Sequence, residues 1–257
     1  MKILCCMNLK GGVGKTVTAI NLADILVRQY HKSVVLADCD GQMNLTRFFF
    51  PDFDPAEEYT MASLLMGDGE PVWCDNLTPV CDGLNLIPGS SQLYDLDLAA
   101  IRNQGGILLR KVDDFCHCAA SDGETDFFIF DCPPGYTFAS MAALMAADEV
   151  IIPMTVDGFS FTGMMDMQNQ MKSLRRVRGN IRIAGVLLTQ WHNSEVVRQG
   201  EALVRTLEVP VFKTVIRRTD KVPESTFDRS SIVRYSPGSA AAQDYRRWVQ
   251  EYLGEVL

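Results

Sequence analysis

The sequence has no run of 18 apolar residues, so no segment is expected to span a membrane as a helix. Its first residues lack the basic stretch and the small-residue cleavage site of a signal peptide. Eight cysteines occur in 257 residues without the spacing of a secreted disulfide framework, and we expect reduced thiols in a cytoplasmic protein. Histidine is scarce, and none of the three residues stands in a nucleophile–base arrangement.

The chain is acidic, with 24 Lys and Arg residues against 32 Asp and Glu residues and a net charge of −8. This balance argues against a protein whose whole surface binds nucleic acid. The charge is uneven, because residues 1–150 carry 9 basic and 21 acidic side chains, whereas residues 172–221 carry 11 basic and 4 acidic ones. A local cationic face is therefore expected in the second half of the chain.

Apolar runs of strand length alternate with segments of helical character. The expected strands are residues 3–7, 34–37, 84–87, 127–130, 150–154, 183–188 and 211–216. The expected helices are residues 15–30, 92–120, 138–147, 160–178, 194–207 and 239–256. Most of the apolar runs are continuous, which is typical of parallel strands that are covered on both faces. The pattern predicts a doubly wound α/β fold with a mainly parallel sheet, and residues 1–257 are expected to form one domain.

Two regions outside this pattern need separate interpretation. The segment 48–82 is rich in Pro, Asp and Glu, and we interpret it as loop with a short helix at residues 61–66. The last expected helix carries an apolar face, which favours packing on the core over anchoring in a membrane. That face consists of Tyr245, Trp248, Val249, Tyr252, Leu253 and Val256. No membrane partner is expected.

The segment that carries the functional prediction follows the first expected strand and opens the first expected helix. Glycine lets backbone amides turn around an anion without interference from a Cβ atom, and the helix N-terminus adds partial positive charge. Lys15 is expected to reach the β- and γ-phosphates, and the Thr16 hydroxyl to bind Mg²⁺. The expected nucleotide-binding residues are Lys10, Gly11, Gly12, Val13, Gly14, Lys15 and Thr16.

A general phosphate loop begins with glycine, whereas this one begins with Lys10. The run Lys-Gly-Gly-Val-Gly-Lys-Thr resembles the signature of the ParA/Soj family of deviant Walker A partitioning ATPases. The resemblance implies that Lys10 crosses the interface of a nucleotide-sandwich dimer, while Lys15 serves the nucleotide of its own subunit. Lys10, Lys15 and Asp40 are accordingly our candidates for catalysis.

The segment after the second expected strand supplies Asp40. Residues 38–44 read Asp-Cys-Asp-Gly-Gln-Met-Asn, similar to the family pattern Asp-x-Asp-Pro-Gln-x-Asn. By this match Asp40 orients the attacking water and Gln42 lies beside the metal shell. Gly41 departs from the family by replacing its proline. The alternative is that Asp38 and Asp40 serve as turn formers or caps.

The fourth expected strand ends in Asp131, in the layout of a Walker B motif. The carboxylate is expected near Mg²⁺, acting through a metal-bound water, so Thr16, Asp40 and Asp131 are the candidate metal residues. The run Asp-Cys-Pro-Pro at 131–134 resembles the family's version of this motif. Residues 151–154 with 161–163 resemble a family segment beside the dimer interface, and residues 214–225 with 188–189 correspond to the family's adenine pocket.

The resemblance also implies nonspecific DNA binding by the ATP-bound dimer, for which a local basic patch suffices. The candidate residues for this contact are Lys172, Arg175, Arg176, Arg178, Arg198, Arg205, Arg217, Arg218 and Lys221. For residues 172–178 a solvated helix face is an equal alternative. Cys116, His117 and Cys118 suggest a metal site only weakly, because alternate positions on a helix diverge.

These expectations define a cytoplasmic ATPase that requires ATP and Mg²⁺ and associates with the nucleoid when ATP is bound. Its implied partners are a second copy of itself, nonspecific DNA and a ParB-like or other centromere-binding adaptor. Its cargo would be a plasmid, a chromosome or an integrative element. The alternatives are a MinD-like positioning ATPase of a protein cargo, a metabolic ATP-dependent ligase of the same superfamily, and a metal-cluster carrier. A further alternative is a nucleotide-gated binding module without hydrolysis, if Gly41 displaces Asp40.

Overall fold

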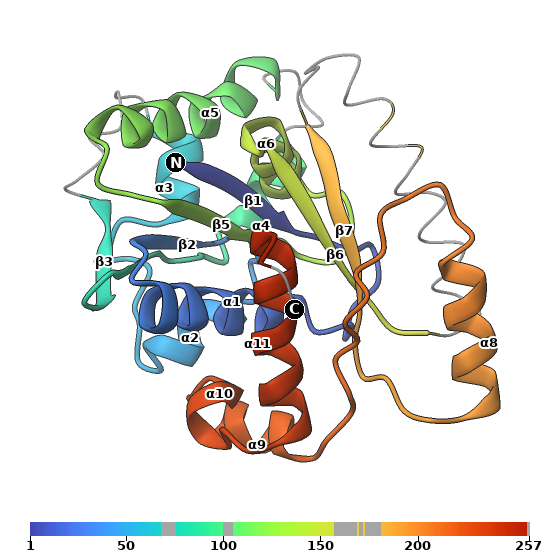
Figure 1. The fold of residues 1–257 in the computed structure, drawn as a ribbon. Coiled ribbons are helices and arrows are strands. Elements are labelled where there is room, and N and C mark those ends of the chain that lie inside the picture. The colour runs from blue at the N-terminus through green and yellow to red at the C-terminus, as the bar shows by residue number, and fades with distance from the viewer. Residues whose placement is uncertain (68–75, 100–104, 157–168, 170–171, 173–180, 256–257) are drawn as a thin grey trace.

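The computed structural model describes residues 1–67, 76–99, 105–156, 169, 172 and 181–255, to which the statements below refer. Seven strands form one sheet in the order β3-β4-β2-β5-β1-β6-β7 (Figure 1). They are β1 (Lys2–Cys6), β2 (Val34–Asp38), β3 (Thr78–Cys81), β4 (Leu84–Ile87), β5 (Phe127–Asp131), β6 (Glu149–Met154) and β7 (Arg182–Leu188). Only β3 pairs antiparallel, with β4, so the predicted doubly wound, mainly parallel sheet is confirmed.

Helices cover both faces of this sheet. Those following β1 and β2 are α1 (Lys15–Tyr30), α2 (Asn44–Phe49) and α3 (Met61–Met66), and those around β5 are α4 (Leu93–Ala99), α5 (Gly105–Asp122) and α6 (Phe138–Ala146). The C-terminal part contains α8 (Glu195–Val204), α9 (Lys221–Phe227), α10 (Ile232–Tyr235) and α11 (Ala240–Leu253). No described helix has both the length and the apolarity needed to cross a bilayer.

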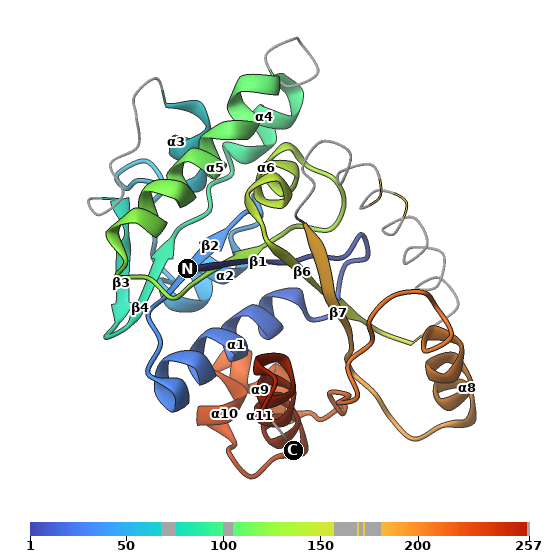
Figure 2. The same ribbon diagram turned by 45° about the horizontal axis from the view of Figure 1, so that its top comes forward.

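The alternation of side chains along β1 divides the core into two layers. Ile3 and Cys5 belong to a buried cluster with side chains of α3 to α6, and Leu4 and Cys6 belong to a second cluster with α1, α2, α10 and α11. Figure 2 shows α5 and α6 on one side of the sheet and α1 and α11 on the other. Since both faces are buried, the parallel strands are mainly apolar with polar residues mostly at their ends, which is why the sequence pattern predicted their positions well.

Two strand predictions need correction. The segment 78–81 was expected to be loop but forms β3, an edge strand paired with β4. Residues 211–216 form no strand and make only an isolated bridge to β7. The amide of Phe212 bonds to Val186, but the next two amides, of Lys213 and Thr214, donate to the carboxylate of Glu251 at 2.6 and 2.9 Å. Glu251, which lies on α11, thus accepts hydrogen bonds from backbone amides that would otherwise be available for strand pairing.

The helix predictions hold for the long amphipathic segments. The short helix at 61–66 and the buried face of α11 are confirmed, with Tyr245, Trp248 and Val249 buried, although Val256 lies outside the described residues. The single helix expected at 92–120 is seen as α4 and α5, and the helix expected at 160–178 falls almost wholly outside the described residues. The short helices α2, α9 and α10 were not predicted, because fewer than eight residues carry little periodicity.

Candidate functional site

A loop joins the carboxyl end of β1 to the N-terminus of α1. Gly12 and Gly14 have φ values of 72° and 86°, a left-handed conformation that side-chain-bearing residues rarely adopt. Two side chains from the end of β7 support the loop from outside: the Thr189 hydroxyl donates to the carbonyl of Val13 at 2.8 Å, and the Gln190 amide donates to that of Gly12 at 2.7 Å. The predicted glycine-rich loop at a helix N-terminus is present as a rigid anion cradle.

Lys15 is the first residue of α1 and is buried, with 8% of its surface exposed. Its ammonium donates to the carbonyl of Lys10 at 3.0 Å and so closes the loop on itself. Burial lowers the pKa of Lys15, and the negative charges of Asp131 and Asp40 oppose this shift. A buried cation at the loop is well placed to receive phosphate oxygens.

Asp131 ends β5 and is 2% exposed. Burial and the nearby charge of Asp38 raise the pKa of the Asp131 carboxyl, while a hydrogen bond with the Thr16 side chain lowers it. Its Oδ1 has no hydrogen-bond partner among the described residues, which is costly for a buried carboxylate. A hydroxyl beside a carboxylate with a free buried oxygen fits Mg²⁺, which takes one or two protein oxygens and keeps several waters. Thr16 and Asp131 would hold the ion.

The described residues contain no group of three or more His, Cys, Asp and Glu side chains arranged to hold a metal ion. Cys116 is buried and Cys118 is exposed, so the two thiols do not face a common point.

The turn after β2 holds two carboxylates in different surroundings. Asp38 is buried and accepts hydrogen bonds from the amide and hydroxyl of Thr46 at 2.8 and 2.7 Å. Burial raises its pKa to about 6 despite these bonds. Asp40 accepts from the amide of Gln42 at 2.9 Å and reaches the cavity. Asp38 is therefore a structural acceptor, and Asp40 is the carboxylate of this turn that lines the cavity.

One cavity of about 970 Å³ unites these elements at the carboxyl edge of the sheet. Its lining includes residues 11, 12 and 14–16 of the phosphate loop and Asp40, together with residues 216–220, 222 and 223 of the segment leading into α9. The latter segment is the region that the resemblance assigned to adenine. Sequence reasoning missed several lining residues, among them Arg47, Phe48, Tyr94 and Arg229. They come from short elements without a recognisable motif, so no local signal marked them.

Lys10 does not line this cavity. It lines a smaller hollow of about 340 Å³ together with Gly11, Gly12, Gln190 and Arg218, which line the large cavity as well. Of the two lysines of the loop, Lys15 lines the nucleotide-sized cavity and Lys10 lies outside it.

The basic residues expected to contact DNA differ in their surroundings. Arg198 pairs with Glu195, Arg205 with Glu201 and Lys221 with Glu224, all on the surface. Arg218 is exposed and has no ion-pair partner among the described residues. Lys172 is exposed, and Arg175, Arg176 and Arg178 lie outside the described residues.

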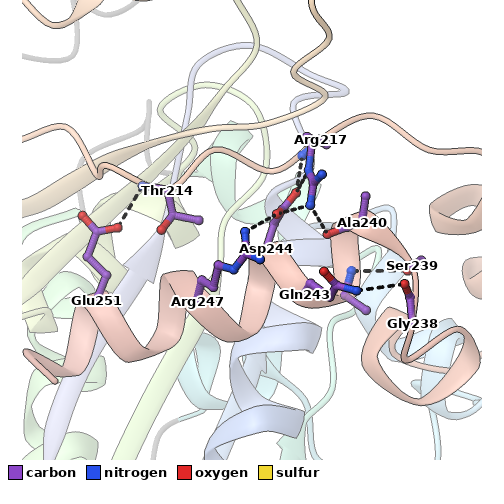
Figure 3. Close-up of polar contacts among 10 residues, drawn as sticks. Thr214, Arg217, Gly238, Ser239, Ala240, Gln243, Asp244, Arg247 and Glu251 are labelled. Atoms are coloured by element: carbon purple, nitrogen blue, oxygen red, sulfur yellow. Dashed lines mark hydrogen bonds and ion pairs between the residues drawn. The ribbon is translucent and has the colours of Figure 1, made fainter. Parts of the chain in front are cut away.

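Arg217 is held most firmly. The carboxylate of Asp244, which is nearly buried, accepts from the amide, Nε and Nη2 of Arg217 at 3.0, 2.8 and 2.7 Å (Figure 3). Figure 3 also shows Glu251 on the same helix holding Thr214. The Arg217 side chain therefore fixes the loop to α11 instead of projecting as a free cation.

These features together define a P-loop nucleotide site at the carboxyl edge of a parallel sheet. They are a glycine-rich loop, a buried lysine at the loop, a buried carboxylate and a cavity of nucleotide size. A protein-family model described as an AAA domain matches residues 1–183. The chain is 31% identical over 253 residues to the chromosome-partitioning ATPase Soj of Thermus thermophilus, covering 97% of this chain and 94% of that protein. The chain therefore belongs to the ParA/Soj family, within the ParA/MinD superfamily of P-loop ATPases.

Solved structures share the fold. A variant of Cyanothece McdA in complex with ATP superposes with a TM-score of 0.85 at 22% identity, covering 100% of this chain and 98% of that one. The septum site-determining protein MinD of Pyrococcus horikoshii, complexed with Mg-ADP, gives a TM-score of 0.76 at 24% identity and covers 97% and 95% of the two chains. At these identities the likeness concerns the fold alone.

Proposed function

We propose that this chain is a partitioning ATPase that hydrolyses Mg-ATP and uses the nucleotide to control a homodimer that binds DNA. The observation that carries the proposal is the convergence of Lys15, Thr16 and Asp40 on one cavity beside the unsatisfied oxygen of Asp131. Phosphoryl transfer requires little else, because positioning and charge stabilisation supply most of its catalysis.

Each residue has a defined task in this proposal. The amides of residues 11–16 surround the β- and γ-phosphates, and the Lys15 ammonium leaves the Lys10 carbonyl to bind phosphate oxygen. Thr16 and Asp131 hold Mg²⁺, which neutralises charge on the phosphates when bound. Asp40 accepts a hydrogen bond from the attacking water and holds it in line with the γ-phosphate. The residues 216–223 enclose the base.

Lys10 is assigned to the neighbouring subunit's nucleotide. Support comes from its position, since it lies outside the chain's own cavity while remaining in the phosphate loop. A cation supplied across an interface stabilises the charge of the transition state only when the dimer has formed. Hydrolysis is therefore slow in the monomer, and a ParB-like adaptor accelerates it in the dimer.

DNA binding is assigned to the second half of the chain, where the basic excess lies. Contacts to phosphate require cationic side chains without base-reading geometry, so the binding is nonspecific. The ATP-bound dimer doubles the number of these contacts, and this is how the nucleotide controls DNA binding. In the cell the ATP state would reside on the nucleoid.

The test is duplex DNA binding by the full chain without nucleotide, with ADP, and with ATP plus Mg²⁺, at two salt concentrations, with mass measured in parallel. We expect binding only with Mg-ATP, together with the dimer mass, and weaker at higher salt. An ATP-dependent dimer that ignores DNA would instead favour a MinD-like ATPase that positions a protein cargo. A monomer that hydrolyses ATP only with a small acid would favour a metabolic ligase.

A further inference from the structure

Tyr94 lies over the turn that carries the water-orienting carboxylate. A Cβ atom built on Gly41 would lie 2.7 Å from both Cε2 and Cζ of the Tyr94 ring, well inside van der Waals contact. The Tyr94 hydroxyl also meets the Gln42 side-chain amide, whose nitrogen donates to it at 2.6 Å. The ring thus covers residue 41 and bonds to residue 42 of the same turn.

The base of the ring is fixed by its own element. Tyr94 follows Leu93, which is buried in the core, at the start of α4. The strand-to-helix segment before it is anchored at Gly89, whose amide donates to the Thr46 hydroxyl at 2.8 Å. Thr46 in turn bonds to Asp38. The elements that present Tyr94 and the Asp40 turn are therefore joined at a second point, which limits how far the ring can move away.

Contacts continue from the ring to the carboxylate. The backbone amide of Gln42 donates to the Asp40 carboxylate at 2.9 Å, and its side-chain amide donates to the Tyr94 hydroxyl. Gln42 therefore ties the phenol to the carboxylate. Tyr94 remains 43% exposed and lines the same cavity as Asp40. A residue in this position limits the orientations of Asp40 without itself being a reacting group.

We propose that Tyr94 is a positioning residue for Asp40, and that residue 41 is glycine because the Tyr94 ring occupies the space of a side chain there. The inference rests on the proposed ATPase function and adds a residue to its hydrolytic step. Gly41 does not have a left-handed φ, so its backbone accepts alanine and the ring alone opposes it. This separates the effect of the ring from that of glycine's backbone freedom.

The experiment is a double-mutant cycle with Gly41→Ala and Tyr94→Ala, measured as the ATP hydrolysis rate at saturation and the Kd for Mg-ATP. We expect each single variant to hydrolyse about tenfold more slowly with a Kd within about twofold of wild type. In the Tyr94→Ala background, Gly41→Ala should cause no further loss. Tyr94→Phe keeps the ring and removes the bond to Gln42, so its loss should be smaller.

A readout without nucleotide accompanies the kinetics. Gly41→Ala should lower the Tm of the unliganded chain by about 2–4 °C in the wild-type background and leave it unchanged in the Tyr94→Ala background. Tyr30→Phe is the matched control, because it removes a phenol bond to Glu255 at the far end of α1. It should leave the hydrolysis rate and the Kd at wild-type values.

The outcomes separate the two proposals. A wild-type chain that neither binds nor hydrolyses Mg-ATP would overturn the proposed function. An active wild type with equal losses from Gly41→Ala in both backgrounds, or with an undiminished rate in Tyr94→Ala, would overturn the positioning role alone. A raised Kd with an unchanged rate would make Tyr94 a binding residue and would also contradict the inference.

Discussion

Lys15 contributes a buried positive charge beside the backbone donors of the phosphate loop. Among the described residues, Lys15 is the one lysine that lines the cavity, so replacing it by alanine removes the ammonium of this lining. We expect Lys15→Ala to weaken ATP binding by about 100-fold, measured by calorimetry, because hydrogen bonds to charged groups in a buried site are each worth about 1.5–3 kcal/mol. Lys32→Ala, at an exposed pair with Asp126, is the control and should bind ATP as wild type does.

Asp40 affects a different step. Because Asp40 lines the cavity and we assign it to the attacking water, its removal should spare binding and impair the orientation of water. We expect Asp40→Ala to bind ATP within about threefold of wild type and to hydrolyse it about 100-fold or more slowly, so that an ATP-bound dimer accumulates. Hydrolysis at the wild-type rate would show that another group orients the water.

Asp38 makes stability depend on pH. Its pKa in the folded chain is about 6, raised by burial from the usual carboxyl value near 4, so the folded state holds a proton that the unfolded state has already lost. Between about pH 4 and 6 the stability contribution therefore falls as pH rises. Relative to Asp38→Asn, the wild type should lose about 1–2 kcal/mol of unfolding free energy between pH 5 and 7, measured by denaturant titration. If the unfolding free energies of the wild type and Asp38→Asn differed by the same amount at every pH, the raised pKa of Asp38 would be contradicted.

At the scale of elements, the Arg217–Asp244 pair joins α11 to the segment that we assign to the base (Figure 3). Arg217→Ala removes the guanidinium and leaves the buried Asp244 carboxylate with the backbone amide of residue 217 at 3.0 Å and the distant Arg247 at 3.8 Å. We expect a loss of about 1–3 kcal/mol in unfolding free energy, less than for a fully buried pair because solvent reaches Arg217.

The same variant should affect the base and the phosphates of the nucleotide differently. Because we assign the segment 216–223 to the base and the phosphate loop to the phosphates, we expect Arg217→Ala to weaken binding of ATP about tenfold while leaving binding of inorganic tripolyphosphate unchanged. Arg247→Ala is the control and should alter neither. Equal losses of affinity for both ligands would show that Arg217 supports the stability of the fold and not the binding of the base.

The elements that were predictable share one property: their sequence pattern reflects their burial directly. β1, β5 and the helix α1 are continuous or periodic in apolar residues, and the loop between β1 and α1 carries a motif, so both fold and phosphate site could be read from the sequence. The segment 211–216 is equally apolar, yet Glu251 takes two of its amides. A side chain 37 residues away along the chain decides that outcome, and no local pattern contains it.

The missed site residues follow the same rule. Tyr94 is separated from Gln42 by 52 positions, and α4, which presents it, has seven residues. The Gly41 departure from the family was visible in the sequence, but its cause is a ring that only the tertiary structure brings there. Motifs predict what a segment does alone, whereas these contacts depend on how segments meet.

At the scale of the whole molecule, the DNA binding that we propose must coexist with a net charge of −8. The acidic first half would repel DNA, so the proposed affinity depends on the few cations of the second half that their neighbours leave free. Arg205 donates to Glu201 and to the carbonyls of Phe212 and Lys213, and it is already engaged. Arg218 is exposed and free of ion pairs within the described part of the chain, so it is our first candidate for a phosphate contact.

We therefore expect Arg218→Ala to weaken duplex DNA binding of the Mg-ATP dimer and to reduce the slope of log Kd against log salt by about one, since one fewer counterion is released. Arg205→Ala should leave that slope at its wild-type value. Arg218 also lines the nucleotide cavity, so ATP affinity is measured for each variant. Arg218→Lys separates the two roles: a phosphate contact needs only the charge, so lysine should restore the slope, and an unrestored slope at normal ATP affinity would remove Arg218 from the DNA surface.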